Sequence, residues 1–116
     1  MEKLILVGLV EPLDASAVPA FEQWYLGNHV EDTSHCPKIR RGTVYKLAKK
    51  FAGPVQSQYL AIYEWEIDDL VEAEKTLMRW QSDPSAFPAR LPPNGSLKIL
   101  GSGWYERALA FETEKG

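Results

Sequence analysis

Hydrophobic and polar positions along the chain follow the periods of strands and of helices in turn. The first apolar run, residues 3–10, is continuous, which favours a strand covered on both faces. Residues 14–32 then carry apolar side chains at the spacing of a helix, and Pro37 prevents the helix from continuing. The apolar stripe of this helix consists of Val18, Phe21, Tyr25 and His29. Later patterns predict two strands, a second helix and a last strand at residues 39–50, 58–67, 69–81 and 97–111.

Residues that commonly begin helices support these boundaries. The first helix starts either with Ser16 as its N-cap or with Pro19 at its first position, and we expect Asp68 to cap the second helix. The resulting order, β-α-β-β-α-β, is the ferredoxin-like α+β arrangement, in which two helices cover one face of an antiparallel sheet. The length of 116 residues is usual for one domain, so we expect residues 1–116 to form a single domain.

The third predicted strand, residues 58–67, carries two different apolar faces. Aromatic residues such as Tyr63 and Trp65 lie on one face, and Leu60 and Ile62 lie on the other. Two helices bury only one face, and a large exposed apolar patch is rare on a monomer, so we expect a homodimer in which two sheets face one another. We expect the aliphatic residues to meet the helices and the aromatic residues to line the space between the sheets. A bulge at a glycine of the last strand would reverse this assignment.

Charge and cysteine content exclude several classes of partner. The net charge of −3 argues against nucleic acid, which is bound mainly through clustered Lys and Arg. Cys36 is the only cysteine, so the fold does not depend on an internal disulfide. The apolar start of the chain is too short to span a bilayer. We therefore expect a cytoplasmic protein that binds neither nucleic acid nor membrane.

Titratable and aromatic residues are crowded between residues 21 and 47. This stretch holds both histidines, the only cysteine and the adjacent pair Arg40 and Arg41. His29 stands one helical turn after Tyr25, and its imidazole titrates near neutrality, which suits a general base that removes a proton next to a carbonyl group. The alternative is that His29 stabilises the end of the helix as a cation.

Cys36 and its neighbours offer two further hypotheses, which the spacing does not favour. A nucleophilic Cys36 next to His35 has no third residue to orient the base. A metal site built from His29, Asp32, His35 and Cys36 matches no familiar spacing of ligands. We therefore expect no metal ion.

The run FEQWYLGNHV, followed by Pro37 and the run RRGTVYKL, resembles the EthD-like family. In that family a Phe-x-x-Trp-Tyr-x-x-x-His run ends the first helix. The resemblance implies a dimeric α+β barrel, a superfamily that includes cofactor-free monooxygenases, lactone isomerases, polyketide cyclases, lyases and heme proteins. It also implies that His29 is a functional residue, with Tyr45 as its partner.

Several residues are candidates for the wall of a pocket. Tyr45 and Arg41 share one face of the second strand, where they could anchor a carbonyl or phenolate oxygen, although Arg41 could instead pair with a surface carboxylate. The remaining candidates are aromatic and could equally be core residues: Trp24, Tyr25, Tyr63, Trp65 and Trp104. The proline-rich connection 82–96, with Phe87 and Leu91, could close over the pocket or contact a second subunit.

These residues support one preferred function and two alternatives. We expect a small enzyme without a cofactor that moves a proton on an aromatic, lactone or polyketide-like molecule. His29, Tyr45 and Tyr63 would be catalytic, while the substrate would contact Trp24, Tyr25, Arg41, Trp65 and Trp104. The first alternative is a non-catalytic protein that binds a small hydrophobic compound, and the second is a structural dimer with a filled interior.

Overall fold

The computed structural model describes residues 4–54, 57–87 and 97–113 of the chain. Four strands form an antiparallel sheet in the order β2-β3-β1-β4. The strands are β1 (Leu4–Pro12), β2 (Ile39–Lys46), β3 (Tyr59–Trp65) and β4 (Leu97–Glu106). This order is that of the ferredoxin-like fold, so the predicted fold class is confirmed.

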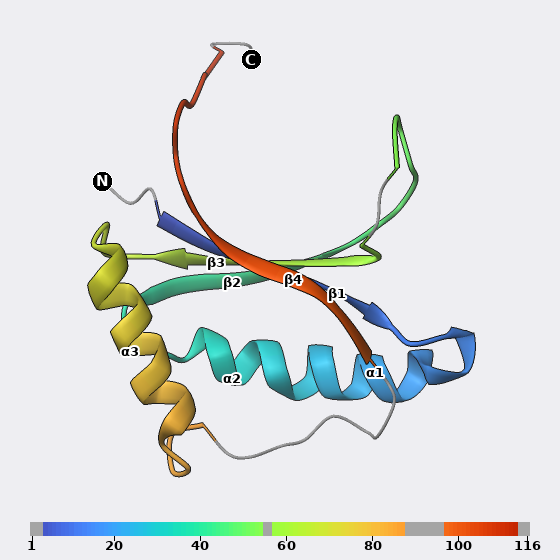
Figure 1. Cartoon of the computed structure of the whole chain (residues 1–116), viewed down its shortest axis with the longest axis horizontal. Helices are drawn as coiled ribbons and strands as arrows, with labels where there is room; N and C mark the ends of the chain where they lie inside the picture. Colours follow the sequence, from blue (N-terminus) through green and yellow to red (C-terminus); the bar gives the residue numbers. More distant parts are fainter. Residues whose placement is uncertain (1–3, 55–56, 88–96, 114–116) are drawn as a thin grey trace.

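The helical segments all lie on one side of the sheet (Figure 1). They are the 3-10 turn η1 (Ala15–Ala17), α1 (Val18–Trp24), the π-helical turn η2 (Tyr25–His29), α2 (Val30–Ser34) and α3 (Leu70–Ser82). The first four follow one another as a nearly continuous rod under the sheet, and α3 stands beside the end of that rod (Figure 1). No helix in the described ranges is long and apolar enough to cross a membrane.

Both predicted helix caps need correction by one or two residues. Asp14, not Ser16, caps the first turn, because its carboxylate accepts hydrogen bonds from the Ser16 hydroxyl (2.6 Å) and the Ala17 N–H (3.1 Å). Asp69, not Asp68, caps α3. Its backbone has the extended conformation of an N-cap, and its carboxylate accepts a hydrogen bond from the N–H three residues later (3.2 Å).

The expected assignment of the two sheet faces is wrong. The aromatic face of β3 meets the helices, and the residues buried there are Tyr59, Ala61, Tyr63 and Trp65. The ring of Phe21 from α1 lies 4.9 Å from the ring of Tyr59. The helical rod presents the rings of Phe21 and Tyr25 to this face, and ring pairs at such separations attract one another beyond the area that they bury.

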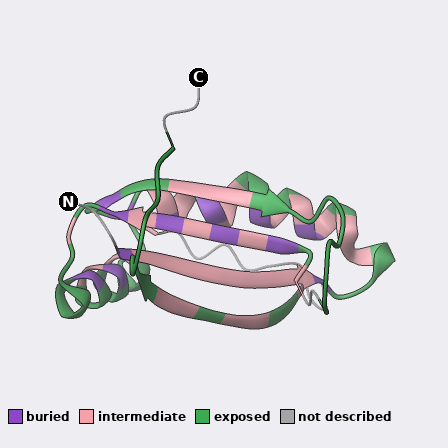
Figure 2. Cartoon of the chain, turned by 90° about the horizontal axis from the view of Figure 1, so that it is seen from above, coloured by how far each residue is buried: buried purple, intermediate pink, exposed green. Residues whose placement is uncertain are grey.

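The opposite face of the sheet is open and mainly aliphatic. It carries Ile5, Val7, Leu9, Leu60 and Ile62 from the two central strands. Around this centre lie Tyr45 on β2 and Tyr105 on β4, each 56% exposed. Figure 2 views the sheet from this open side, with buried and less buried positions alternating along β3. No described element covers this face.

Near the end of the rod, α2 packs closely against β2 and is hydrogen-bonded to α3. A methyl group added to Gly42 of β2 would overlap the Ser34 hydroxyl, so the missing side chain lets α2 approach the sheet closely. On the other side of α2, the Trp80 indole N–H donates a hydrogen bond to the Asp32 carbonyl oxygen (2.9 Å). These contacts position the helical turn that precedes α2.

Candidate functional site

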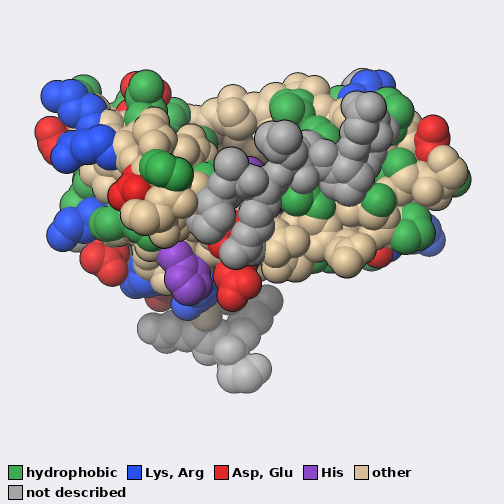
Figure 3. Space-filling view, turned by 90° about the horizontal axis from the view of Figure 1, so that it is seen from below, with side chains coloured by type: hydrophobic (Ala, Val, Ile, Leu, Met, Phe, Trp, Pro, Cys, Tyr) green, Lys and Arg blue, Asp and Glu red, His purple; other side chains and the backbone are tan. Residues whose placement is uncertain are grey.

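A cavity of about 540 Å³ lies between the helices and the sheet. This volume is in the range of about 300–1,000 Å³ that is usual for small-molecule pockets. Its floor comes from β1 and β4, and its walls come from the first helical rod and α3; the lining includes Leu6, Gly8, Val10, Trp24, Tyr25, His29, Thr33, Tyr63, Leu77, Met78, Ile99, Ser102 and Trp104. The lining is mainly apolar. Seen from the helix side, most Lys and Arg side chains lie at one end of the molecule, away from the middle (Figure 3).

His29 forms part of the cavity wall and is surrounded by rings. Its ring centre lies 4.8 Å from that of Trp24 and 5.8 Å from that of Tyr25, and both pairs are stacked. Phe87, which follows α3, presents its ring edge to His29 at 6.2 Å. Burial lowers the pKa of His29, and the negative charge of Asp32 only partly opposes this shift. The imidazole is therefore neutral at pH 7 and can accept a proton.

The π-helical turn η2 explains how these rings come together. The N–H of Val30 donates to the carbonyl of Tyr25, five residues earlier, instead of the usual four. Residues five apart in an α-helix point in different directions, but the wider π turn aligns Trp24 with His29. Turns of this kind occur frequently at functional sites.

Two buried phenols, those of Tyr25 and Tyr63, line the same cavity as His29. Burial raises the pKa of Tyr25 to about 12. Burial also raises the pKa of Tyr63, and nearby Tyr25 adds to this shift, while a hydrogen bond with Thr33 opposes it. The Thr33 hydroxyl in turn donates to the His29 carbonyl oxygen (2.9 Å). Both phenols therefore remain protonated at neutral pH and can serve as hydrogen-bond donors.

Five of the eight predicted site residues line the same cavity: Trp24, Tyr25, His29, Tyr63 and Trp104. Tyr45 does not join them, because it pairs with Leu60 and lies on the open face of the sheet. The expected contact between Tyr45 and His29 is therefore absent, and Tyr63 takes the position that we expected for Tyr45. The alternation of side chains along β2 and β3 separates the two tyrosines.

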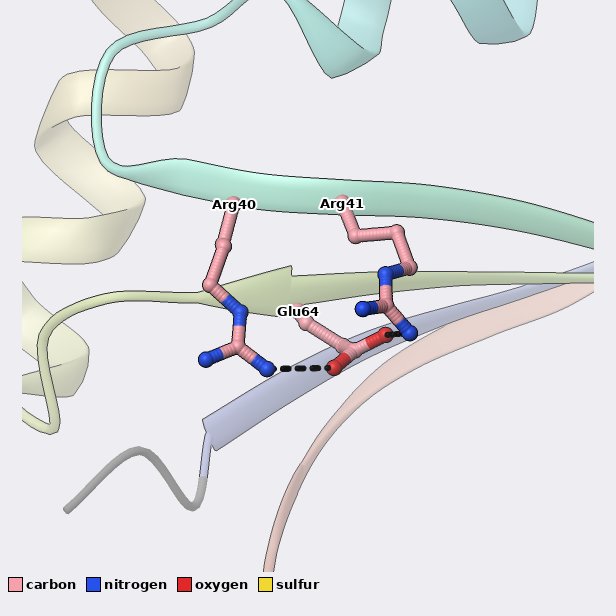
Figure 4. Close-up of polar contacts among 3 residues, drawn as sticks. All are labelled: Arg40, Arg41 and Glu64. Atoms are coloured by element: carbon pink, nitrogen blue, oxygen red, sulfur yellow. Dashed lines mark hydrogen bonds and ion pairs between the residues drawn. The ribbon is translucent and has the colours of Figure 1, made fainter.

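Arg41 also lies on the open face, where its guanidinium is 3.7 Å from the Glu64 carboxylate. Arg40 reaches the same carboxylate at 3.5 Å, and Figure 4 shows Glu64 between the two arginines. This is the surface pairing that the sequence left open for Arg41. Such exposed ion pairs contribute roughly 0–1 kcal/mol to stability.

Trp65 is a core residue and does not line the cavity. It is fully buried, and its ring lies 5.3 Å from that of Trp104. Its indole N–H makes no hydrogen bond to any described residue. Trp65 therefore packs in the core against Trp104, and only Trp104 of this pair lines the cavity.

Cys36 and the residues near it give no support to a reactive thiol. Cys36 is buried, and burial raises the pKa of its thiol to about 11, which disfavours the thiolate. Within the described ranges, no group of three or more His, Cys, Asp or Glu side chains could hold a metal ion. Leu91 of the proline-rich connection lies outside the described residues.

Several residues of the cavity wall were not predicted as site residues, among them Gly8 and Thr33. Gly8 had a visible signal, because it interrupts an apolar strand. Thr33 had none, since only the packing of α2 on β3 places its hydroxyl beside Tyr63 and the His29 carbonyl.

Comparisons with known proteins show the fold. No family model matches the chain, and no curated protein matches it. The structure of HapK from Hahella chejuensis is similar, with a TM-score of 0.53, 14% sequence identity, and 97% of this chain and 99% of that chain covered. The heme-degrader MhuD from Mycobacterium tuberculosis, solved with two hemes bound in its active site, has a TM-score of 0.59 and 14% identity, with 94% and 99% covered. The chain therefore shares the ferredoxin-like α+β fold with these two structures.

Proposed function

We propose that the cavity binds a small aromatic or cyclic molecule and that His29 removes a proton from a carbon atom next to its carbonyl group. The observation that carries this proposal is the neutral imidazole of His29, held by stacked rings in the wall of an apolar cavity. The resemblance of this stretch to the EthD-like family gives the same histidine the same role.

The roles of the neighbouring residues follow from their chemistry. When His29 takes the proton, the electron pair of the C–H bond moves toward the carbonyl oxygen and forms an enolate. The phenol of Tyr63, kept protonated by burial, can donate a hydrogen bond to that oxygen. The rings of Trp24 and Trp104 provide flat apolar surfaces for the ring of the substrate. Chemistry of this kind needs a base and a donor and no cofactor.

Hydrogen–deuterium exchange on a model ketone tests this role directly. We expect the protein in D₂O to accelerate exchange of the α-protons of 2-tetralone, followed by proton NMR. His29→Gln should slow this exchange about 100-fold or more, because a general base contributes at least that factor. His35→Gln is the matched control, since His35 is exposed in the turn after α2 and should leave the rate unchanged. Equal rates for both variants would remove His29 from the mechanism.

A binding protein for a small hydrophobic compound is the second candidate. It is favoured by the lining itself, in which apolar and aromatic side chains outnumber polar ones. In that case His29→Gln would leave the affinity for aromatic compounds nearly unchanged, and no exchange would be catalysed. Mass spectrometry of molecules that co-purify with the native protein would identify the ligand for either function.

We further propose that the chain acts as a homodimer through the open face of its sheet. The centre of this face is aliphatic, and the Glu64 carboxylate near its margin is paired with Arg40 and Arg41, so no unpaired carboxylate faces a second copy there. In such a dimer the aliphatic residues, not the aromatic ones, fill the space between the sheets. Light scattering of the purified chain at micromolar concentration should give twice the mass of the monomer.

A further inference from the structure

Gly8 occupies a position in β1 where a glycine is not expected. It lies in the middle of the strand, on the face toward the helices, between the apolar residues Leu6 and Val10. A glycine inside a strand weakens it, because it offers no side chain for packing and loses more backbone freedom on folding. Its presence therefore needs a physical reason.

The usual structural reasons for a glycine do not apply to Gly8. Its backbone is not in the left-handed region, unlike that of Gly53 and Gly101. A Cβ atom added to Gly8 would meet only the Cβ of Ala61, at 4.0 Å, which is an ordinary contact. Gly42 is the opposite case, because a Cβ there would overlap Ser34. Neither backbone strain nor tight packing thus requires glycine at position 8.

The space that the missing side chain leaves belongs to the cavity. Gly8 lines the cavity floor together with its neighbour on β4, Ser102, which is also small. Two residues away along β1, the next positions on this face carry the larger side chains of Leu6 and Val10. The floor therefore carries no side chain at Gly8, and a side chain added at this position would take up space in the cavity.

We propose that Gly8 is the specificity-determining residue of this cavity and that the depth it leaves admits the second ring of a fused-ring ligand. This inference rests on the proposed use of the cavity for small-molecule binding, but it does not depend on proton transfer. A single-ring ligand can bind against the rings around His29 without reaching Gly8. A flat ligand with two fused rings extends over Gly8, where an added side chain would collide with it, and a larger side chain would do so more severely.

Binding of two phenolic probes tests the role of Gly8 apart from catalysis. Phenol and 2-naphthol carry the same hydroxyl group on one ring and on two fused rings, and calorimetry gives both affinities. Gly8→Val should weaken 2-naphthol binding by roughly tenfold or more, the range expected when a pocket changes by a few carbon atoms. It should change phenol binding by less than roughly threefold, because the space near His29 is untouched.

Two further variants keep this test decisive. Gly8→Ala adds one methyl group with only an ordinary contact, so it should fold and should show the same preference to a smaller degree. Gly103→Ala adds a methyl group on β4 outside the cavity lining, 3.4 Å from the Tyr105 ring, and should change neither affinity. Equal losses for both probes, unchanged 2-naphthol binding in Gly8→Val, or no binding of 2-naphthol to the wild-type chain would each overturn the inference. The exchange assay with His29→Gln is independent of these outcomes.

Discussion

The close approach of α2 to β2 at Gly42 can be tested by adding a single methyl group. In Gly42→Ala the new Cβ would overlap the Ser34 hydroxyl oxygen and would lie 3.1 Å from both the Ser34 Cβ and the Tyr63 Cδ1. Real Cβ atoms rarely approach other atoms so closely, so either α2 moves away or Ser34 rotates. This site matters because α2 also carries Thr33, whose hydroxyl meets Tyr63 and the His29 carbonyl.

The expected cost of Gly42→Ala follows from these contacts. Forcing an extra carbon atom into a packed interior costs about 1–3 kcal/mol. Rotating Ser34 instead would break the hydrogen bond from its hydroxyl to the Val30 carbonyl (2.6 Å), which is worth about 1 kcal/mol. Alanine recovers about 0.5–1 kcal/mol relative to glycine in a strand. Subtracting this gain from the packing cost leaves a net loss of up to about 2.5 kcal/mol. We expect a value near 1 kcal/mol, or roughly 4 °C in Tm for a chain of this size.

Urea unfolding, followed by tryptophan fluorescence at one protein concentration, measures this loss. Ser34→Gly removes both the hydroxyl and the Cβ that the new methyl group meets, so Gly42→Ala should cost much less in that background. The coupling energy of this double-mutant cycle should be about 1–2 kcal/mol. Gly8→Ala is the matched control, since it adds the same methyl group to a strand without a clash. A Gly42→Ala variant more stable than the wild type, or a cycle without coupling, would refute the close approach of α2 to β2.

Two further predictions concern His29 and the open face of the sheet. Because burial lowers the pKa of His29 below its usual value of 6.5, the unfolded chain binds a proton at a higher pH than the folded chain, so the free energy of unfolding should fall as pH decreases through 6.5. His29→Gln should remove this part of the pH dependence and His35→Gln should not; identical profiles for wild type and His29→Gln would contradict the shift. Ile62→Lys places a charge in the middle of the open aliphatic face, where Ile62 pairs with Val7 and Thr43. It should convert the proposed dimer to a monomer in light scattering without unfolding it, and an unchanged mass would exclude this face as the interface.

The sequence by itself determined the order of the elements and much of the cavity wall. Hydrophobic periods distinguish strands from helices because side chains repeat every two residues in one and every three to four in the other. The helical spacing placed Tyr25 and His29 on one stripe, and both line the cavity. Those inferences depend only on the spacing of residues within one segment, so they need no knowledge of how the segments pack together.

Only the tertiary structure decided which face of the sheet meets the helices, because local geometry allows either face. Along β3 both faces are apolar, so the alternation of residues 59–65 fits either orientation, and only the packing of the helices against the sheet shows which face is buried. That selection placed Tyr63 in the cavity and Tyr45 outside it. The π turn that aligns Trp24 with His29 likewise depends on how the rod packs against the sheet. Several residues of the site could therefore be predicted from the sequence, but their partners could not, because partners are determined by packing between segments far apart in the sequence.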